Sequence, residues 1–216
     1  MERKTRIYLV RHGETEFNRL GIFRGRYEVE LNERGRKQAA EIAGALAAEG
    51  IQALYAGPLK RTRETAGIIA RRLGLECAVD EGFNNILLGE WQGVPKDTIK
   101  RDYPEAWQQW QTAPEHLLVP GGETVEDLKR RAYARITEIV GEIAAGPAST
   151  PTIAIVTHRS VMKVLASAFL GVPAPYFWKF YVDNAAYSVF EHDEAGFSLI
   201  AWNVTAHLSE RVAEVW

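Results

Sequence analysis

The amino-acid sequence predicts an α/β fold: a three-layer sandwich in which helices cover both faces of a mostly parallel central sheet. Short apolar segments typical of strands alternate with longer amphipathic segments typical of helices, which is the pattern of parallel α/β sheets. The chain has 216 residues, 46% hydrophobic and 25% charged, enough for one sizeable core. No internal repeat or low-complexity segment interrupts it. We therefore expect a single domain spanning residues 1–216.

The first half of the chain predicts two strand–helix units and a third strand. The expected elements are, in order, a strand at residues 6–10, a helix at 31–50, a strand at 51–56, a helix from Pro58 to about Leu73 and a strand at 75–79. In the first helix Asn32 is a suitable N-cap and Gly50 a suitable terminator. Pro58 suits the first turn of the second helix, because the amide hydrogen that proline lacks has no partner there.

Residues 80–122 interrupt this alternation. They are rich in glycine, proline, tryptophan and asparagine, and they carry two short helical stretches near residues 96–103 and 105–110. We interpret the segment as an excursion that covers one end of the sheet rather than as a second domain.

The remainder of the chain returns to strands and helices. A long amphipathic helix follows Glu123, because apolar residues keep helical spacing from Val125 to Ile143. The other expected elements are a loop at 146–151, a strand at 152–158, a helix at about 160–170 and two strands within 186–205 that flank a turn at Glu194–Gly196.

Bulk properties exclude several classes of function. The formal net charge of −2 provides no field that would attract nucleic acid or an anionic membrane. No segment approaches the roughly 20 apolar residues that span a bilayer, and the first apolar run stops at Arg11, too early for a signal-peptide core. Cys77 is the only cysteine, which fits a reducing compartment. We expect a cytoplasmic protein.

The sequence offers no motif for a metal or a cofactor. The five histidines lack the spacing of zinc ligands, and there is no glycine-rich phosphate loop or dinucleotide-binding motif. The aromatic segment 175–182 is interpreted as core packing rather than as an oligomer contact. We expect no cofactor, no metal, and either a monomer or a homodimer.

Basic residues follow two of the predicted strands. Arg11 and His12 follow the first strand, His158 and Arg159 follow the most apolar strand, and Arg61 lies in the first turn of a helix that follows another. The carboxyl ends of parallel strands meet at one edge of a sheet, so these side chains should converge. One arginine or histidine at a strand end is usually structural, but two basic pairs together favour an anion site. A tetrahedral phosphate is the natural occupant.

Five motifs in order resemble the histidine phosphatase superfamily, in the branch that contains cofactor-dependent phosphoglycerate mutases and small broad-specificity phosphatases. They read LVRHGETEFN, LNERGRKQA, YAGPLKRTRETA, GEWQG and VTHRSVMKVLASAFLG, and together they cover essentially the whole chain. The resemblance implies a phosphoglycerate mutase-like fold and hydrolysis of small-molecule phosphate esters. Residues 80–122 would then form a cap over the active site and set the substrate.

The resemblance also implies roles for residues at matching positions. His12 would be the nucleophile that forms a phosphohistidine intermediate. The groups implied to surround the phosphoryl group and stabilise its charge are Arg11, Arg61 and His158. The implied substrate-binding residues are Thr15, Asn18, Arg24 and Gly25. An attacking histidine nitrogen must be deprotonated, so we expect the other ring nitrogen of His12 to donate to a backbone carbonyl.

A phosphatase is favoured over a mutase. Mutases of this type carry an extra segment with a Glu-Arg-His-Tyr-Gly-like stretch after the GEWQG block, and this chain reads VPKDTIKRDYPEAWQQW there. The acid-phosphatase and phytase branch usually continues the first motif with a further arginine and proline, which RHGETEFN lacks. A phosphoglycerate mutase is kept as an alternative.

One position departs from the family pattern where it bears on the mechanism. Family members resemble Leu-Arg-Glu-Ile-x-x-Gly-x-Trp, and that glutamate protonates the leaving oxygen and then activates water. Aligned on Gly89 and Trp91, this chain has Asn85 in place of the glutamate. An amide can form hydrogen bonds but cannot deliver a proton at neutral pH.

Three explanations of Asn85 are open. Glu81, or as a second choice Glu90, supplies the proton; or the leaving group needs little protonation, as in acyl, aryl or histidyl phosphates; or the protein is a weak or inactive phosphatase that binds phosphate esters. Two smaller departures affect specificity at most: Arg159 replaces a common glycine, and Ala56-Gly57 replaces common serines.

Overall fold

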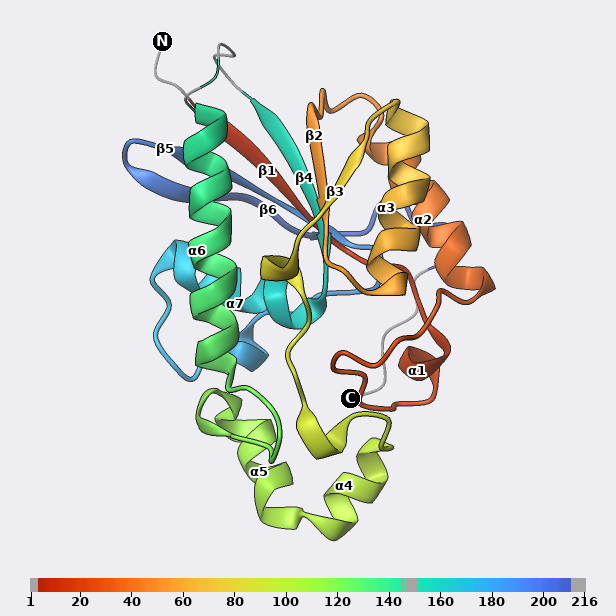
Figure 1. Ribbon diagram of the computed structural model, residues 1–216, viewed down its shortest axis with the longest axis vertical. Helices are drawn as coiled ribbons and strands as arrows, with labels where there is room; N and C mark the ends of the chain where they lie inside the picture. The colour runs from red at the N-terminus through yellow and green to blue at the C-terminus, as the bar shows by residue number, and fades with distance from the viewer. Residues whose placement is uncertain (1–3, 145, 147–150, 211–216) are drawn as a thin grey trace.

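The computed structural model describes residues 4–144, 146 and 151–210. Within these ranges six strands form one sheet in the order β3-β2-β4-β1-β5-β6 (Figure 1). The strands are β1 (Thr5–Arg11), β2 (Ala53–Ala56), β3 (Cys77–Val79), β4 (Thr152–Thr157), β5 (Tyr187–Asp193) and β6 (Gly196–Val204). The first four pair in parallel, whereas β5 is antiparallel to β1 and to β6. The predicted mostly parallel sheet is confirmed, with an antiparallel hairpin at one edge.

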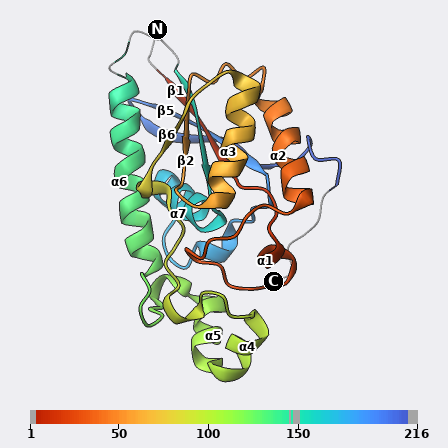
Figure 2. The same ribbon diagram turned by 45° about the vertical axis from the view of Figure 1, so that its right-hand side comes forward.

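Helices cover both faces of this sheet, on opposite sides in Figures 1 and 2. They are α2 (Glu33–Leu46) and α3 (Lys60–Leu73) on one face, and α6 (Val125–Ala144) and α7 (Arg159–Leu170) on the other. Alternate residues of β1 serve the two layers: Ile7 and Leu9 pack in the cluster of α6 and α7, whereas Tyr8 and Val10 pack in that of α2 and α3. A strand that is buried on both faces has a continuous run of apolar residues in the sequence, and this run predicted β1. The predicted three-layer sandwich is confirmed.

Local signals place helix ends to within a few residues. Asn32 caps α2 by accepting a hydrogen bond from the amide of Gly35 at 2.8 Å. The helix stops at Leu46 rather than near Gly50, because the residues that follow form tight turns through bonds such as Glu49 N to Leu46 O at 3.2 Å.

The second helical unit is also shorter than predicted. Its α3 begins at Lys60, because Leu59, not Pro58, takes the extended N-cap conformation. The strand expected at 75–79 is only Cys77–Val79. The predicted strand starts later than expected because the amide of Leu75 donates to a carbonyl in the last turn of α3, not to a neighbouring strand.

The later elements follow the prediction closely. The expected turn at 194–196 joins β5 to β6, and α7 starts directly after His158. Most of the loop expected at 146–151 lies outside the described residues. Outside residues 80–122, two short helices were not predicted. One is α1 (Glu16–Arg19), which a capping box between Thr15 and Asn18 begins, and the other is η4 (Phe177–Lys179), in the segment after α7.

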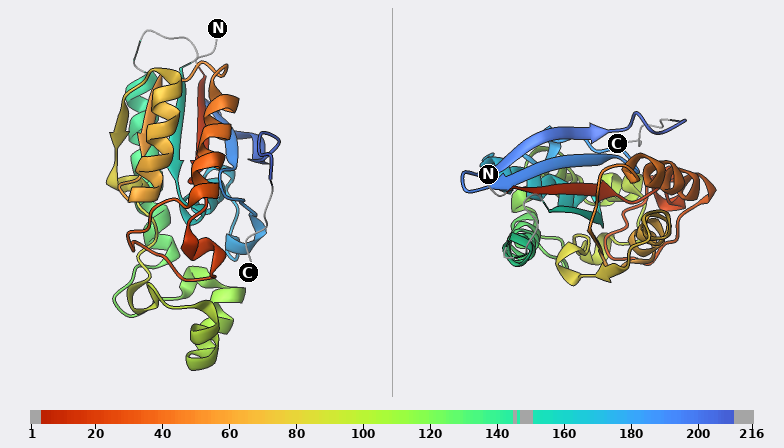
Figure 3. Two further views of the ribbon diagram at one scale, coloured as in Figure 1. Left: turned by 90° about the vertical axis from the view of Figure 1, so that its right-hand side faces the viewer. Right: turned by 90° about the horizontal axis from the view of Figure 1, so that it is seen from above.

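Residues 80–122, called the cap segment below, lie beyond the carboxyl ends of the parallel strands (Figures 1 and 3). The segment contains the short helices η1 (Glu81–Phe83), η2 (Gly89–Trp91), α4 (Lys96–Asp102), α5 (Pro104–Thr112) and η3 (Pro114–His116). An aromatic cluster docks it: the ring centroid of Phe23 lies 5.2, 6.4 and 5.5 Å from those of Trp91, Trp107 and Trp110. None of the helices in the described ranges has the length and apolarity that crossing a bilayer requires.

Candidate active site

The two basic pairs lie side by side because β1 and β4 are neighbours in the sheet. Arg11 stands opposite Thr157 in the parallel register, and the amide of His12 donates to the carbonyl of Thr157 at 3.1 Å. The imidazole centroids of His12 and His158 are therefore only 5.3 Å apart, with the rings inclined at 65°. Both side chains are buried.

Backbone carbonyl groups orient the two fully buried arginines, Arg11 and Arg61. Nη1 of Arg11 donates to the carbonyl of Val182 at 2.7 Å. Arg61 donates to the carbonyls of Gly25 and Tyr27, at 2.8 and 2.9 Å. A carbonyl oxygen carries no full negative charge, so these contacts position the guanidinium groups without neutralising them.

The ring of His12 is held as one tautomer. Its Nδ1 lies 2.7 Å from the carbonyl oxygen of Gly13. A carbonyl can only accept, so Nδ1 carries the proton and Nε2 keeps its lone pair, as expected from the sequence. Burial and the charges of Arg61 and Arg11 hold the pKa of His12 well below its ordinary value. At neutral pH the imidazole is uncharged, with one nitrogen able to attack.

The ring of His158 is also uncharged at neutral pH, because burial and the charge of Arg61 hold its pKa well below the ordinary value. Neither of its ring nitrogens has a hydrogen-bond partner among the described residues, and the same is true of Nε of Arg61. Burial and Arg24 lower the pKa of Arg61 to about 9, so this side chain stays protonated at pH 7. Buried polar atoms without partners, beside guanidinium groups, indicate a place built for an anion.

These side chains surround a cavity of about 50 Å³, called the inner cavity below. Its basic and polar lining consists of Arg11, His12, Arg24, Asn85, Lys96, His158, Arg159 and Ser160. A single water needs roughly 10–15 Å³ of such space, so a phosphoryl group with its oxygens fits. The described residues that line the cavity include no carboxylate. Arg61 does not line the cavity itself. It donates a hydrogen bond to the carbonyl of Gly25, and Gly25 is one of the lining residues.

Asn85 lines the inner cavity and is tightly held there. Its Nδ2 donates to the carbonyl of Gly25 at 2.8 Å, and its Oδ1 accepts from the hydroxyl of Ser160 at 2.5 Å. Its backbone carbonyl accepts from Arg26 and Arg131, at 3.1 and 3.0 Å. Both ends of the side-chain amide are therefore fixed in the wall of the inner cavity.

The two glutamates considered as replacements lie elsewhere. Glu81 is exposed in η1, where its Oε2 accepts from Asn84 at 3.0 Å. Glu90 is exposed in η2. Neither is among the residues that line the inner cavity.

The four predicted substrate-binding residues divide into two pairs. Arg24 and Gly25 line the inner cavity. Thr15 and Asn18 do not: the Thr15 hydroxyl donates to Oδ1 of Asn18 at 2.8 Å, and the same oxygen accepts from the Thr15 amide at 3.0 Å. This buried pair fixes the loop that leads to Arg24.

Two glycines permit close backbone approaches around the histidines. A Cβ on Gly13 would lie 2.3 Å from the carbonyl oxygen of Gly35, so a side chain there would push the His12 loop off α2. A Cβ on Gly57 would lie 2.6 Å from the carbonyl oxygen of Phe83. The glycine that replaces a common serine thus lets the cap segment approach the sheet.

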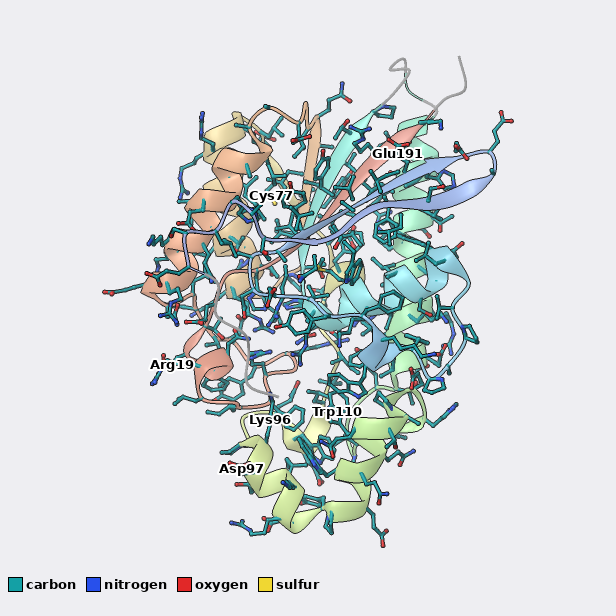
Figure 4. The ribbon with its side chains drawn as sticks, turned by 180° about the vertical axis from the view of Figure 1, so that it is seen from behind. Arg19, Cys77, Lys96, Asp97, Trp110 and Glu191 are labelled. Carbon is teal, nitrogen blue, oxygen red and sulfur yellow. The ribbon has the colours of Figure 1, made fainter. Side chains whose placement is uncertain are left out.

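A second cavity of about 310 Å³, called the outer cavity below, adjoins the first. The two share Phe23, Lys96, Trp110 and Arg159, and the outer one adds Lys163 among others. Lys96 and Lys163 were not identified from the sequence. Lys163 could have been found, because it lies one helical turn after Arg159 on the helix that follows His158. The position of Lys96 at the cavity depends on how α4 docks. Figure 4 shows Lys96 and Trp110 where the cap meets the rest of the molecule.

Comparisons with known proteins identify the family of this chain. Residues 7–205 match the histidine phosphatase superfamily (branch 1). The chain is 34% identical to Phosphoserine phosphatase 1 of Hydrogenobacter thermophilus over 97% of both chains, and 30% identical to "Probable phosphoglycerate mutase GpmB" of Yersinia pestis over 94% of both. The solved structure of Bacillus stearothermophilus YhfR superposes with a TM-score of 0.87 at 30% identity, over 94% of this chain and 98% of that one. The chain therefore belongs to the histidine phosphatase superfamily, branch 1, as its motifs predicted.

Proposed function

We propose that the protein is a phosphatase that hydrolyses phosphate monoesters through a phosphohistidine intermediate on His12. The observation that carries the proposal is the hydrogen bond from Nδ1 of His12 to the carbonyl of Gly13. It leaves the Nε2 lone pair available for attack on phosphorus. The phosphatases among the relatives support the same reaction class.

The reaction runs in two steps. First, Nε2 of His12 bonds to phosphorus while the bond from phosphorus to the ester oxygen breaks, and the leaving group departs with that electron pair. Then a water oxygen bonds to phosphorus, the phosphorus–nitrogen bond breaks, and His12 is regenerated with inorganic phosphate as the product. The proton that the water loses neutralises the departed oxyanion, directly or through solvent.

Fixed positive charge supplies the main stabilisation of the transition state. Arg11 and Arg24 line the inner cavity, and the charge of Arg61 reaches both histidines. Because backbone carbonyls already orient Arg11 and Arg61, these groups need no rearrangement when negative charge develops on the phosphoryl oxygens. The neutral ring of His158 carries one N–H group, which can donate to the same oxygens.

Asn85 sets the preference among substrates. It cannot protonate the leaving oxygen, and the described lining offers no carboxylate in its place. Of the three explanations of Asn85, the geometry favours substrates whose leaving group departs without a proton, such as aryl or acyl phosphates.

Trapping the intermediate tests the proposal. After incubation with ³²P-labelled 4-nitrophenyl phosphate and rapid quenching, we expect acid-labile, base-stable label on His12, located by mass spectrometry. His12→Ala should abolish labelling and phosphate release. His116→Ala, at an exposed position in the cap segment, is the matched control and should keep both. Absence of label together with unchanged turnover in His12→Ala would exclude this mechanism.

Two other functions give different outcomes. The missing carboxyl group favours a phosphate-ester-binding protein without turnover, which would bind 4-nitrophenyl phosphate but release no phosphate. The 30% identity to GpmB favours a mutase, which would convert 3-phosphoglycerate to 2-phosphoglycerate when supplied with its bisphosphate primer. Formation of that product would overturn the phosphatase assignment.

A further inference from the structure

We infer that the outer cavity binds the leaving group of the substrate, and that it selects a leaving group combining a ring or other apolar body with a second anionic group. The inference rests on the proposed function for the position of the scissile phosphate. It concerns a different set of side chains, so it can be tested apart from hydrolysis.

The two cavities form one continuous site. Phe23, Lys96, Trp110 and Arg159 border both of them. A phosphate ester whose phosphoryl group lies beside His12 must direct its ester oxygen away from the attacking nitrogen, because displacement at phosphorus is in line. The outer cavity, about 310 Å³ against about 50 Å³, is the space with room for the remainder of the substrate.

Aromatic side chains form most of the apolar wall of the outer cavity: Trp107, Trp110, Trp178, Phe180 and Tyr181. Hydrogen bonding fixes part of this wall, since the indole of Trp178 donates to the carbonyl of Trp110 at 2.6 Å. The rings of these two tryptophans lie edge to face, 5.5 Å apart. Rigid aromatic faces favour a flat or apolar ligand body at little conformational cost.

Three cations complete the lining: Lys96, Arg159 and Lys163. The described residues that line the cavity contribute no carboxylate. Lys163 is 1% exposed, and its ammonium lies 4.6 and 4.3 Å from the ring centroids of Phe177 and Trp178. The guanidinium of Arg159 lies 5.9 Å from the Trp178 ring. A desolvated ammonium among aromatic rings attracts an anion more strongly than a hydrated surface lysine does.

The positions of the three cations separate their roles. Lys96 and Arg159 border the inner cavity as well, so both can also contact the scissile phosphate. Lys163 lines the outer cavity but not the inner one. A second anionic group on the leaving group, a carboxylate or a further phosphate, is therefore assigned to Lys163.

Three aryl phosphates test the inference: phenyl phosphate, 4-carboxyphenyl phosphate and 4-carbamoylphenyl phosphate. The last two have nearly the same shape, but only the carboxylate is charged. We expect kcat/KM for the carboxylate to exceed that for the amide by about tenfold or more, the usual size of a charged hydrogen bond. The difference should lie mainly in KM.

Variants identify the group responsible. Lys163→Met, which keeps the length of the side chain, should reduce the carboxylate-to-amide ratio to about twofold or less, and Lys163→Arg should retain most of the ratio. Lys100→Met removes an exposed lysine from α4 and should leave the ratio unchanged. No preference for the carboxylate in the unaltered protein, or a preference that survives Lys163→Met, would overturn the inference.

The corresponding aryl phosphonates separate this inference from hydrolysis, because they bind without reacting. Calorimetry on the unaltered protein should show tighter binding of the 4-carboxyphenyl compound than of the 4-carbamoyl compound. If that difference depends on Lys163 while no aryl phosphate is hydrolysed, the inference stands and the proposed function fails. If the two phosphonates bind equally while hydrolysis is intact, the proposed function stands and the inference fails.

Discussion

Asn85 holds the candidate site together through both ends of its side-chain amide. Its Nδ2 and Nη2 of Arg61 donate to the same carbonyl, that of Gly25. Its Oδ1 accepts from Ser160. A carboxyl group at this position could keep the bond to Gly25 only as a donor, that is, in its protonated form. That hydrogen bond favours the protonated form that a general acid requires, whereas the cationic lining of the inner cavity favours the carboxylate.

This geometry predicts a gain of function. Asn85→Glu should raise kcat on alkyl phosphates at least about tenfold, because general acid catalysis is worth roughly 10²–10⁴ in rate. Turnover of 4-nitrophenyl phosphate, whose leaving group needs little protonation, should change much less. The comparison of kcat on the two substrates is the measurement.

Two further variants make this result decisive. Asn85→Asp keeps the size of the side chain but sets the carboxyl group one methylene further from the substrate, so its gain should be smaller. Glu81→Gln should have little effect, because Glu81 is exposed and outside the lining. A large loss in Glu81→Gln with no gain in Asn85→Glu would assign the acid to Glu81.

The sequence revealed the residues whose position follows from strand ends. Arg11, His12 and His158 lie at the ends of β1 and β4 or directly after them, so the parallel sheet alone brings them together. Lys96 and Lys163 could not be assigned in the same way. Their place in the outer cavity depends on how the cap segment docks on α7, and that docking is a tertiary property with no local signature.

At the scale of elements, a buried carboxylate joins the cap segment to the loop that follows α7. Glu115 of η3 is 2% exposed, and its Oε1 accepts from the amides of Tyr176 and Phe177 at 2.6 and 2.9 Å. Phe177 lines the inner cavity and its neighbour Trp178 the outer one. One side chain therefore holds in place a segment that contributes to the walls of both cavities.

Removing this carboxylate should weaken both stability and substrate binding. Glu115→Ala leaves two buried amides without an acceptor, so the free energy of unfolding should fall by about 1–3 kcal/mol per amide. KM for 4-carboxyphenyl phosphate should rise as the wall loosens. Glu115→Gln keeps an acceptor oxygen and should lose much less. Urea denaturation and steady-state kinetics measure both effects.

Glu105→Ala is the control for this prediction, since it removes an exposed carboxylate from α5. If Glu115→Ala behaves like Glu105→Ala in both measurements, Glu115 does not hold the wall.

Element boundaries were predictable where the signal is local. Asn32 begins α2 and Gly74, with φ of 69°, ends α3. The length of β3 was not predictable, because the amide of Leu75 bonds to α3 instead of extending the strand. The cap segment could be recognised by composition, but its position depends on tertiary contacts such as the cluster around Phe23.

For the whole molecule, the buried histidines couple stability to pH. The pKa values of His12 and His158 are held well below the ordinary value near 6.5, so below that pH the unfolded chain binds more protons than the folded one. Stability is then complete above about pH 6.5 and falls as the pH drops. Each histidine contributes a slope of up to about 1.4 kcal/mol per pH unit.

Urea denaturation between pH 7.5 and 5.5, a range that limits titration of carboxylates, measures this dependence. The double variant His12→Asn/His158→Asn should show a clearly smaller loss of stability over the range. His116→Asn, at an exposed position, should follow the unaltered protein. A double variant with the full slope would show that other groups cause the dependence.

The order of strands in the sheet has a consequence for how the protein is made. β4 lies between β1 and β2, yet it is among the later elements of the chain. Until the ribosome has released residues 152–157, β1 and β2 have no common partner, and His12 has no His158 beside it. A nascent chain therefore exposes β1, whose partners β4 and β5 both come later, and one edge of β2, which by then can pair only with β3. Such unpaired strand edges are natural targets for chaperones. The nascent chain also lacks the inner cavity, because residues of β1 and the residues after β4 come together only in chains that have completed the central sheet.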